Sequence, residues 1–206
     1  MSFRNVVRTW IHLRNMERDY AGFNQGRTEY FRWAGISMRP ASTGIGGAPY
    51  PVEQNLSLGL YAIQPGASMA VEPISTPMLN EAWTYGSDFS RGLKAEGENG
   101  ITLFVSTTAS IDEGGRSIHT GDFDAQAERM ILNISTLLEV QKASYRDVIS
   151  ATTYLKDAAT VPRLLRLMEK LGIGGFPNAT VQAEVCRPEL LCEMKVLAKS
   201  EKGHNT

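Results

Sequence analysis

A β-prone stretch of this chain reads Asp147-Val148-Ile149-Ser150-Ala151-Thr152-Thr153-Tyr154-Leu155-Lys156-Asp157. A stretch of the same character, Asn5-Val6-Val7-Arg8-Thr9-Trp10-Ile11-His12-Leu13-Arg14-Asn15, lies 142 residues earlier. Each is followed by a segment with helical spacing, then by a proline (Pro40 or Pro177), then by two more β-prone segments. This order predicts an internal duplication, although short strand–helix segments can also resemble each other by chance.

The duplication divides the chain into unequal parts. We expect residues 80–200 to form one complete domain. Residues 1–65 are expected to supply only a strand, a helix and two strands (βαββ), which is the second half of such a domain. Residues 66–79 contain prolines and little periodicity, as is typical of a linker, and residues 201–206 are expected to be a tail.

The larger part has clear helix and strand signals. Residues 122–142 carry apolar side chains at helical spacing, and a second helix is expected from Thr160 to just before Gly172. Strands are expected at residues 101–106, 147–155, 180–186 and 190–198, with a first hairpin at residues 85–106 and a turn at Arg187-Pro188 that pairs the last two strands. The order ββαβαββ predicts an α/β (α+β) domain with its helices on one face of a sheet.

Composition narrows the class of protein. The formal net charge of −1 excludes the broad basic field of many nucleic-acid-binding proteins, so no nucleic-acid partner is expected. No apolar run reaches the roughly 20 residues that span a bilayer, and the first residues, interrupted by Arg4 and Arg8, do not read as a signal peptide. We expect a cytoplasmic protein with no membrane partner.

No cofactor or metal is expected either. The histidines and the two cysteines, Cys186 and Cys192, lack the spacing of metal ligands, and the thiols are expected to be reduced. The glycine-rich segment Gly44-Ile45-Gly46-Gly47 is followed by prolines rather than by a helix, so it is expected to be a hairpin turn and not a phosphate-binding loop.

Several segments resemble the Rid (reactive intermediate deaminase) family, whose domains have a chorismate-mutase-like fold. Three segments follow the Rid pattern: the stretch from Asp147 to Asp157, then Gly172 with Phe176-Pro177, and then the last strand with Glu193. At finer grain the chain is similar to the chorismatases, tandem Rid-like proteins that cleave chorismate. The matching segments are Val7-Arg8-Thr9-Trp10, Tyr20…Phe23…Gly26-Arg27, Pro40-Ala41-Ser42-Thr43-Gly44-Ile45-Gly46, Tyr85-Gly86…Phe89-Ser90-Arg91, Ser106…Thr108-Ala109-Ser110-Ile111 and Gln182-Ala183-Glu184-Val185-Cys186-Arg187-Pro188-Glu189-Leu190-Leu191-Cys192-Glu193.

The chain departs from both patterns. Rid deaminases carry an arginine two residues after the Phe-Pro proline to hold the substrate carboxylate, and here that position is Ala179, so imine deaminase activity is not implied. Chorismatases have a whole first domain, and this chain is expected to lack about the first half of it. Thr107 stands where their loop has a glycine, which narrows the space there.

Two arginines are candidates for binding a substrate carboxylate. Arg27 shares a helix face with Tyr20, Phe23, Tyr30 and Phe31. A guanidinium among aromatic rings suits a bidentate clamp on a carboxylate, or else a structural salt bridge or ring stacking. Arg91, on the expected early strand, is the second clamp or an ordinary edge-strand arginine. The resemblance adds Tyr20, Phe23, Tyr85 and Phe89 to the expected substrate-binding residues.

Glu193 and Cys186 are the candidate catalytic residues. Glu193 follows a very apolar stretch, and burial there raises the pKa of a carboxyl, as a general acid requires. The resemblance implies that this acid protonates the enolpyruvyl methylene of chorismate. The alternative is an ion pair with Lys195 or with an arginine across the sheet. Cys186 is a small core residue or, by the resemblance, shapes the pocket in the branch that yields 3-hydroxybenzoate.

Three functions follow as hypotheses. The first is a chorismatase-like enzyme that releases pyruvate and a hydroxybenzoate from chorismate or a related cyclic enolpyruvyl acid. The second is a non-catalytic protein that binds a small carboxylate or a partner protein. The third is an enamine or imine hydrolase with another carboxylate anchor. Because Rid domains cover one sheet face with neighbouring subunits, we also expect a homo-oligomer, a trimer.

Overall fold

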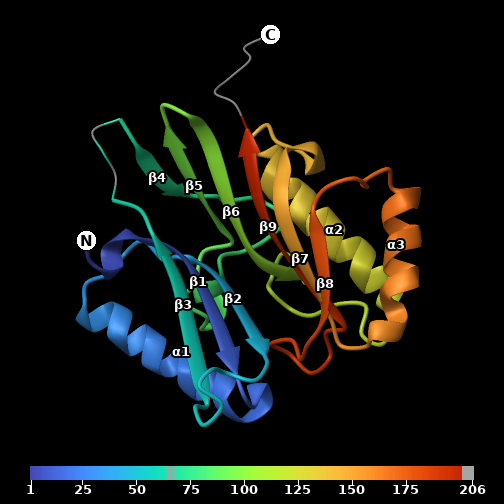
Figure 1. Cartoon of the computed structure of the whole chain (residues 1–206), viewed down its shortest axis with the longest axis horizontal. Helices are drawn as coiled ribbons and strands as arrows, with labels where there is room; N and C mark the ends of the chain where they lie inside the picture. The colour runs from blue at the N-terminus through green and yellow to red at the C-terminus, as the bar shows by residue number, and fades with distance from the viewer. Residues whose placement is uncertain (65, 67, 201–206) are drawn as a thin grey trace.

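The computed structural model describes residues 1–64, 66 and 68–200, with their side chains except that of Tyr85. The chain forms two β-sheets that lie beside each other, with one helix outside the smaller sheet and two helices on the larger one (Figure 1). The smaller sheet has the strand order β2-β1-β3, and the larger sheet has the order β4-β5-β6-β9-β7-β8.

The elements fall into two groups along the chain. The smaller sheet and its helix comprise η1 (Phe3–Asn5), β1 (Val6–Leu13), α1 (Met16–Trp33), β2 (Ala41–Gly46) and β3 (Leu56–Ala62). The larger sheet and its helices comprise β4 (Ala70–Pro73), η2 (Ala82–Tyr85), β5 (Gly92–Gly97), β6 (Gly100–Ala109), α2 (Phe123–Glu139), η3 (Tyr145–Asp147), β7 (Val148–Leu155), η4 (Ala158–Thr160), α3 (Val161–Lys170), β8 (Asn178–Gln182) and β9 (Cys192–Ser200).

The larger unit is the α+β domain that the sequence predicts. Helix α2 begins where the Asp122 side chain accepts a hydrogen bond from the backbone N of Ala125, and α3 ends before Gly172, which has a φ of +67°. Both helices pack on one face of the sheet. There they bury a core with alternate residues of the central strands, among them Val105 and Met194.

The internal repeat is confirmed by shared irregularities as well as by shared strands. Strand β1 pairs parallel with β2 and antiparallel with β3, just as β7 pairs parallel with β8 and antiparallel with β9. In η1 and η3 the backbone N of Ser2 or Ser144 donates to a side chain three residues later, over 2.9 and 2.8 Å. Both antiparallel ladders are irregular directly after Val6 or Val148. Each of these positions recurs 142 residues later.

Three expectations about connections differ from the structure. Strands β8 and β9 are not hairpin partners, because the crossover through α3 places β8 beside β7, and β9 enters between β6 and β7. Residues 66–79 hold more than a linker: they contain β4, which pairs with β5, and Ile74 is buried in the larger core. The glycine-rich segment is not a turn, since Gly44 and Gly46 belong to β2.

The two sheets meet along β2. The backbone N of Ser42 donates to Oγ of Ser106 over 2.8 Å, and the backbone N of Gly46 donates to the carbonyl O of Glu184 over 2.7 Å. A Cβ on Gly46 would lie 2.6 Å from Cβ of Glu184, so this close approach requires a glycine. The contact brings the loop between β8 and β9 against the smaller sheet.

Candidate functional site

Glu193 is a buried acid near the start of β9. Because β9 is flanked by β6 and β7, its backbone neighbours are Ala109 and Tyr154, in the middle of the larger sheet. The side chain is 2% exposed. Burial raises the pKa of Glu193 from its ordinary value of 4.5 to about 7, against the opposing hydrogen bonds of Cys186. A carboxyl in this range can hold a proton and give it up near neutral pH.

Cys186 contacts this carboxyl from the loop between β8 and β9. Its Sγ donates to Oε1 of Glu193 over 3.0 Å. Burial and the neighbouring Glu193 raise the pKa of the Cys186 thiol well above its usual range, so the thiol keeps its proton. The thiol therefore holds Oε1 of Glu193 in place as a hydrogen-bond acceptor.

The expected alternative, an ion pair between Glu193 and Lys195, is not formed in the described part of the chain. Nζ of Lys195 lies 5.7 Å from the centre of the Trp10 ring.

Two small adjoining cavities surround Glu193 and Cys186, with volumes of about 50 and 30 Å³. Both cavities are lined by Tyr20, Phe89, Thr107, Cys186 and Glu193. The larger is also lined by Arg91, and the smaller by Arg27. The structure therefore brings together six of the predicted residues, from α1, from the segment before β5, and from the end of the larger sheet.

Both arginines lie close to one aromatic ring, that of Phe89. Cζ of Arg27 is 5.7 Å and Cζ of Arg91 is 5.8 Å from the centre of the Phe89 ring. Arg91 is 2% exposed, and its Nε donates to the carbonyl O of Asn80 over 2.8 Å. The sequence suggested a position within the early strand, but Arg91 lies one residue before β5. Both guanidiniums are thus oriented by protein groups beside the cavities.

Within helix α1, the side chain of Asn24 orients both Arg27 and Tyr20. Nη2 of Arg27 donates to Oδ1 of Asn24 over 2.6 Å, and Asn24 also hydrogen bonds Tyr20. Burial, with Cys186 and Glu193 nearby, raises the pKa of the Tyr20 phenol, which therefore stays neutral. Gly44 makes room for this ring, since a Cβ there would lie 3.3 Å from Cε2 of Tyr20.

Thr107 enters the site through an irregularity in the sheet. The pairing of β6 with β9 shifts between Val105 and Thr108, and the displaced Thr107 lines both cavities. Its hydroxyl donates to Oγ1 of Thr43 over 2.5 Å. Sequence reasoning noted Thr107 only as a departure from a glycine, and a bulge has no signal in the hydrophobic pattern.

Two predicted residues are not at the cavities. Phe23 stacks under Arg27, with 5.2 Å from Cζ to the ring centre, but it faces an apolar groove toward Leu58 and Leu60 of β3. Tyr85 belongs to η2, and its side chain lies outside the described part of the chain. Sequence reasoning missed Ser42 and Arg187 as lining residues, although both lie in segments that carry the resemblance.

A wider pocket of about 610 Å³ lies beside Cys186, which lines it together with the ends of β1 and β2. Arg14 and Lys156 bring positive charge to its lining, and Glu17 and Glu184 bring negative charge. Cys186 is thus a lining residue of this pocket and of the two inner cavities.

Metal chemistry has no ligand set in the residues that the structure describes, since no group of three or more His, Cys, Asp or Glu side chains comes together there. Within the same residues, no helix combines the length and apolarity needed to cross a membrane.

Sequence comparison identifies relatives of the larger unit. The family described as endoribonuclease L-PSP matches residues 87–200. A RutC family protein of Pyrococcus abyssi is 34% identical over 104 residues, which cover 50% of this chain and 81% of that protein.

Structural comparison extends the likeness to the smaller sheet. A chorismatase crystal structure superposes with a TM-score of 0.80 at 23% identity, over 94% of this chain and 64% of that chain. The chain thus spans about two thirds of the chorismatase length. A Yersinia pestis protein of the conserved Rid family superposes with a TM-score of 0.54 at 18% identity, over 64% of this chain and 100% of that chain. At these identities the likeness establishes the fold, with both sheets arranged as in chorismatase.

Proposed function

Since the chain belongs to the Rid family, described as endoribonuclease L-PSP, we propose that it is a chorismatase-like enzyme. Its substrate would be chorismate or a related cyclic enolpyruvyl acid, and its products would be pyruvate and a hydroxybenzoate-type acid. One observation carries the proposal: a buried carboxyl with a raised pKa, Glu193, shares its cavities with Arg27 and Arg91. A substrate with two carboxylates and an acid-labile enol ether needs this combination.

The reaction assigns a role to each group. Arg27 and Arg91 hold the two carboxylates, and Glu193 gives its proton to the methylene carbon of the enol ether. The resulting oxocarbenium carbon accepts a water molecule, and cleavage of the ether bond releases pyruvate. The ring then loses water to become aromatic, so the water consumed equals the water released. Cys186 holds Oε1 of Glu193 in place through its hydrogen bond.

The size of the cavities favours a second candidate. Cavities of about 50 and 30 Å³ are smaller than ordinary ligand pockets. Chorismate therefore requires that side chains separating the two cavities move, and Phe89 and Thr107 line both. If they do not move, the arginines would still bind a smaller carboxylate without turnover, as in a non-catalytic Rid-like protein.

Incubation with chorismate, followed by mass spectrometry of pyruvate and hydroxybenzoate, separates these functions. The proposed enzyme forms both products in equal amounts. Saturable binding of chorismate or of a smaller carboxylate without pyruvate release would identify the non-catalytic binding protein instead.

We also propose that the chain assembles as a homotrimer. Strand β3 exposes large apolar side chains on both faces: Leu56, Leu58 and Leu60 on one and Tyr61 on the other are each 40–51% exposed. Within the described residues β3 is paired only with β1, so one of its edges is open. Open strand edges and apolar faces are covered in stable proteins. Light scattering at micromolar concentration tests this, and a monomer would contradict it.

A further inference from the structure

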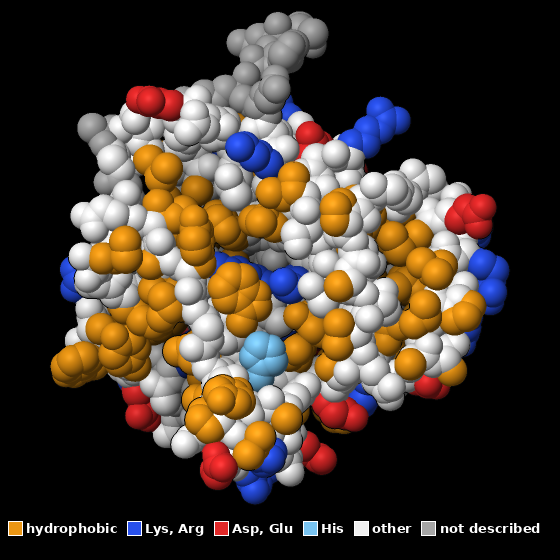
Figure 2. All heavy atoms as spheres, in the orientation of Figure 1, with side chains coloured by type: hydrophobic (Ala, Val, Ile, Leu, Met, Phe, Trp, Pro, Cys, Tyr) orange, Lys and Arg blue, Asp and Glu red, His pale blue; other side chains and the backbone are white. Residues whose placement is uncertain are grey.

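A second hollow, separate from the cavities around Glu193, lies between the two sheets. Its volume is about 300 Å³, and it shares no lining residue with those cavities. Arg8, Trp10 and Tyr61 line it from the smaller sheet, and Phe104, Ser150 and Lys195 line it from the larger one. Figure 2 shows this region near the centre of the molecule, where basic side chains lie deep between hydrophobic ones.

Strand geometry gathers two cations there. Side chains of a strand alternate between its faces, so Arg8 and Trp10 of β1 point away from α1, against which Ile11 and Leu13 pack. On β9, Lys195 lies between Met194 and Val196, which belong to the core under α2, so it points to the opposite face.

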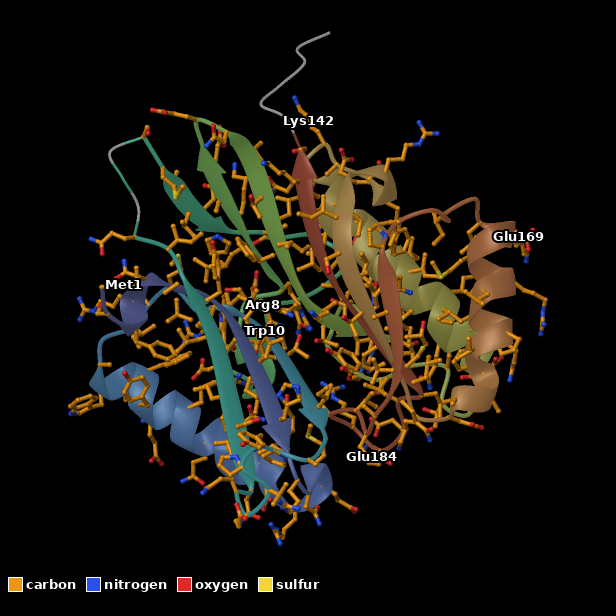
Figure 3. All side chains as sticks on the ribbon, viewed as in Figure 1. Met1, Arg8, Trp10, Lys142, Glu169 and Glu184 are labelled. Atoms are coloured by element: carbon orange, nitrogen blue, oxygen red, sulfur yellow. The ribbon has the colours of Figure 1, made fainter. Side chains whose placement is uncertain are left out.

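Both cations lie over the same indole ring. Cζ of Arg8 is 5.5 Å and Nζ of Lys195 is 5.7 Å from the centre of the Trp10 ring. Figure 3 shows Arg8 and Trp10 beside each other between the sheets. Nearby His12 has a pKa lowered by burial and by Lys195, so it is neutral at neutral pH and supplies no compensating charge.

Arg8 is a buried charge without a counter-ion in the described part of the chain. It is 3% exposed, its Nη2 donates to Oγ1 of Thr43, and its Nη1 has no hydrogen-bond partner there. Burial lowers the pKa of Arg8 to about 9, which still leaves it charged at neutral pH. No Asp or Glu is among the described residues that line the hollow. A buried charge beside a second, partly buried like charge is costly unless an anion compensates them.

We propose that this hollow binds a small aromatic carboxylate. The carboxylate lies against Arg8 and Lys195, where it accepts the hydrogen bond that Nη1 offers. The ring lies against Tyr61 and Phe104, whose own rings are 5.9 Å apart between centres and tilted by 35°. The volume suits one substituted ring, at the lower end of small-molecule sites. The inference is independent of the proposed function, because it uses none of the residues around Glu193.

Titration of isotope-labelled protein with benzoate, and with benzamide as its uncharged isostere, tests the proposal by nuclear magnetic resonance. Benzoate should shift the indole N–H signal of Trp10 and leave that of Trp33, which is 82% exposed, in place. Benzamide should bind about tenfold more weakly or worse. Lys195→Gln and Arg8→Gln should each weaken benzoate by about tenfold or more, and Lys170→Gln, on the exposed end of α3, should not.

Lys195→Gln carries the test if Arg8→Gln does not fold, because Lys195 is only partly buried. Equal affinity for benzoate and benzamide, or tight binding of inorganic phosphate with none of benzoate, would overturn the proposal. So would a change of oligomeric state in Lys195→Gln without benzoate binding to the wild type, because the cations would then pair with an acid of a second copy.

Discussion

The thiol of Cys186 lies 3.0 Å from Oε1 of Glu193, and it donates its proton to that oxygen. The contact joins the loop after β8 to the start of β9. These two strands are not neighbours in the sheet, because β7 lies between them. It lowers the pKa of Glu193, while burial raises it by a larger amount. The acid strength of Glu193 is therefore set by the balance of these two effects.

Replacement of Cys186 should move the pH dependence of catalysis. Cys186→Ala removes a donor that stabilises the ionised carboxylate, so the pKa of Glu193 should rise above about 7. Because the reaction needs the protonated acid, kcat should fall at a higher pH in the variant than in the wild type. Cys186→Ser, which keeps a donor, should retain the wild-type profile. Identical profiles for the alanine variant and the wild type would show that the thiol does not tune the acid.

The raised pKa of Glu193 should also make the free energy of unfolding depend on pH. Between pH 4.5 and about 7 the folded protein holds a proton that the unfolded chain has released. The free energy of unfolding therefore falls as the pH rises through this window and is level above it. A shift of this size corresponds to about 3 kcal/mol.

Glu193→Gln removes this titration. The free energy of unfolding of the variant should exceed that of the wild type by up to about 3 kcal/mol at about pH 8. This difference should disappear at about pH 4. Urea unfolding at the two pH values measures both differences. A gain of the same size at both pH values would mean that folding does not raise the pKa of Glu193.

Substitution of Arg27 or Arg91 should separate binding from stability. Alanine at either position should weaken carboxylate binding by about 1.5–3 kcal/mol, and lysine should restore little, because it lacks the planar fork. Calorimetric titration with substrate measures the loss, and Arg166→Ala, on the exposed face of α3, is the control. Unchanged affinity with a large fall in melting temperature would identify both arginines as structural, through their contacts with Asn24 and Asn80.

Ordinary imine deaminase activity should be absent or very weak. Ala179 is an exposed residue of β8, and its methyl group cannot hold the substrate carboxylate that an arginine holds in Rid deaminases. Assay with imino acids generated from amino acids tests this. Hydrolysis far above the uncatalysed rate would favour the third hypothesis, a hydrolase with another carboxylate anchor.

The elements could be predicted from the sequence because they depend on local patterns. The spacing of apolar residues predicted α2 and α3, with Gly172 just past the end of α3, although the helix expected at 122–142 ends three residues earlier, at Glu139. The 142-residue offset predicted that residues 1–65 repeat the order βαββ, and the two sheets share this order. What failed was strand pairing: adjacency in sequence suggested a hairpin for β8 and β9, whereas the crossover geometry puts β7 between them.

The site was predictable in part for the same reason. Glu193 and Cys186 are close in sequence, and Arg27, Arg91 and Phe89 were proposed from the family resemblance. The role of Thr107 depends on a bulge in β6. The orientation of Phe23 depends on how α1 packs against the smaller sheet. Neither is encoded in local pattern. The hollow around Arg8 needs two strands from different sheets, so no single segment of sequence indicates it.

The most direct test of the central claim is pyruvate release from chorismate by the wild type and by Glu193→Gln, with Glu169→Gln, an exposed glutamate on α3, as the matched control. The claim predicts that the wild type and Glu169→Gln release pyruvate at similar rates. It predicts that Glu193→Gln binds chorismate normally but loses about 100-fold or more of the turnover rate, because an amide cannot deliver the proton. Near-normal pyruvate release by Glu193→Gln, or none by the wild type, would contradict it.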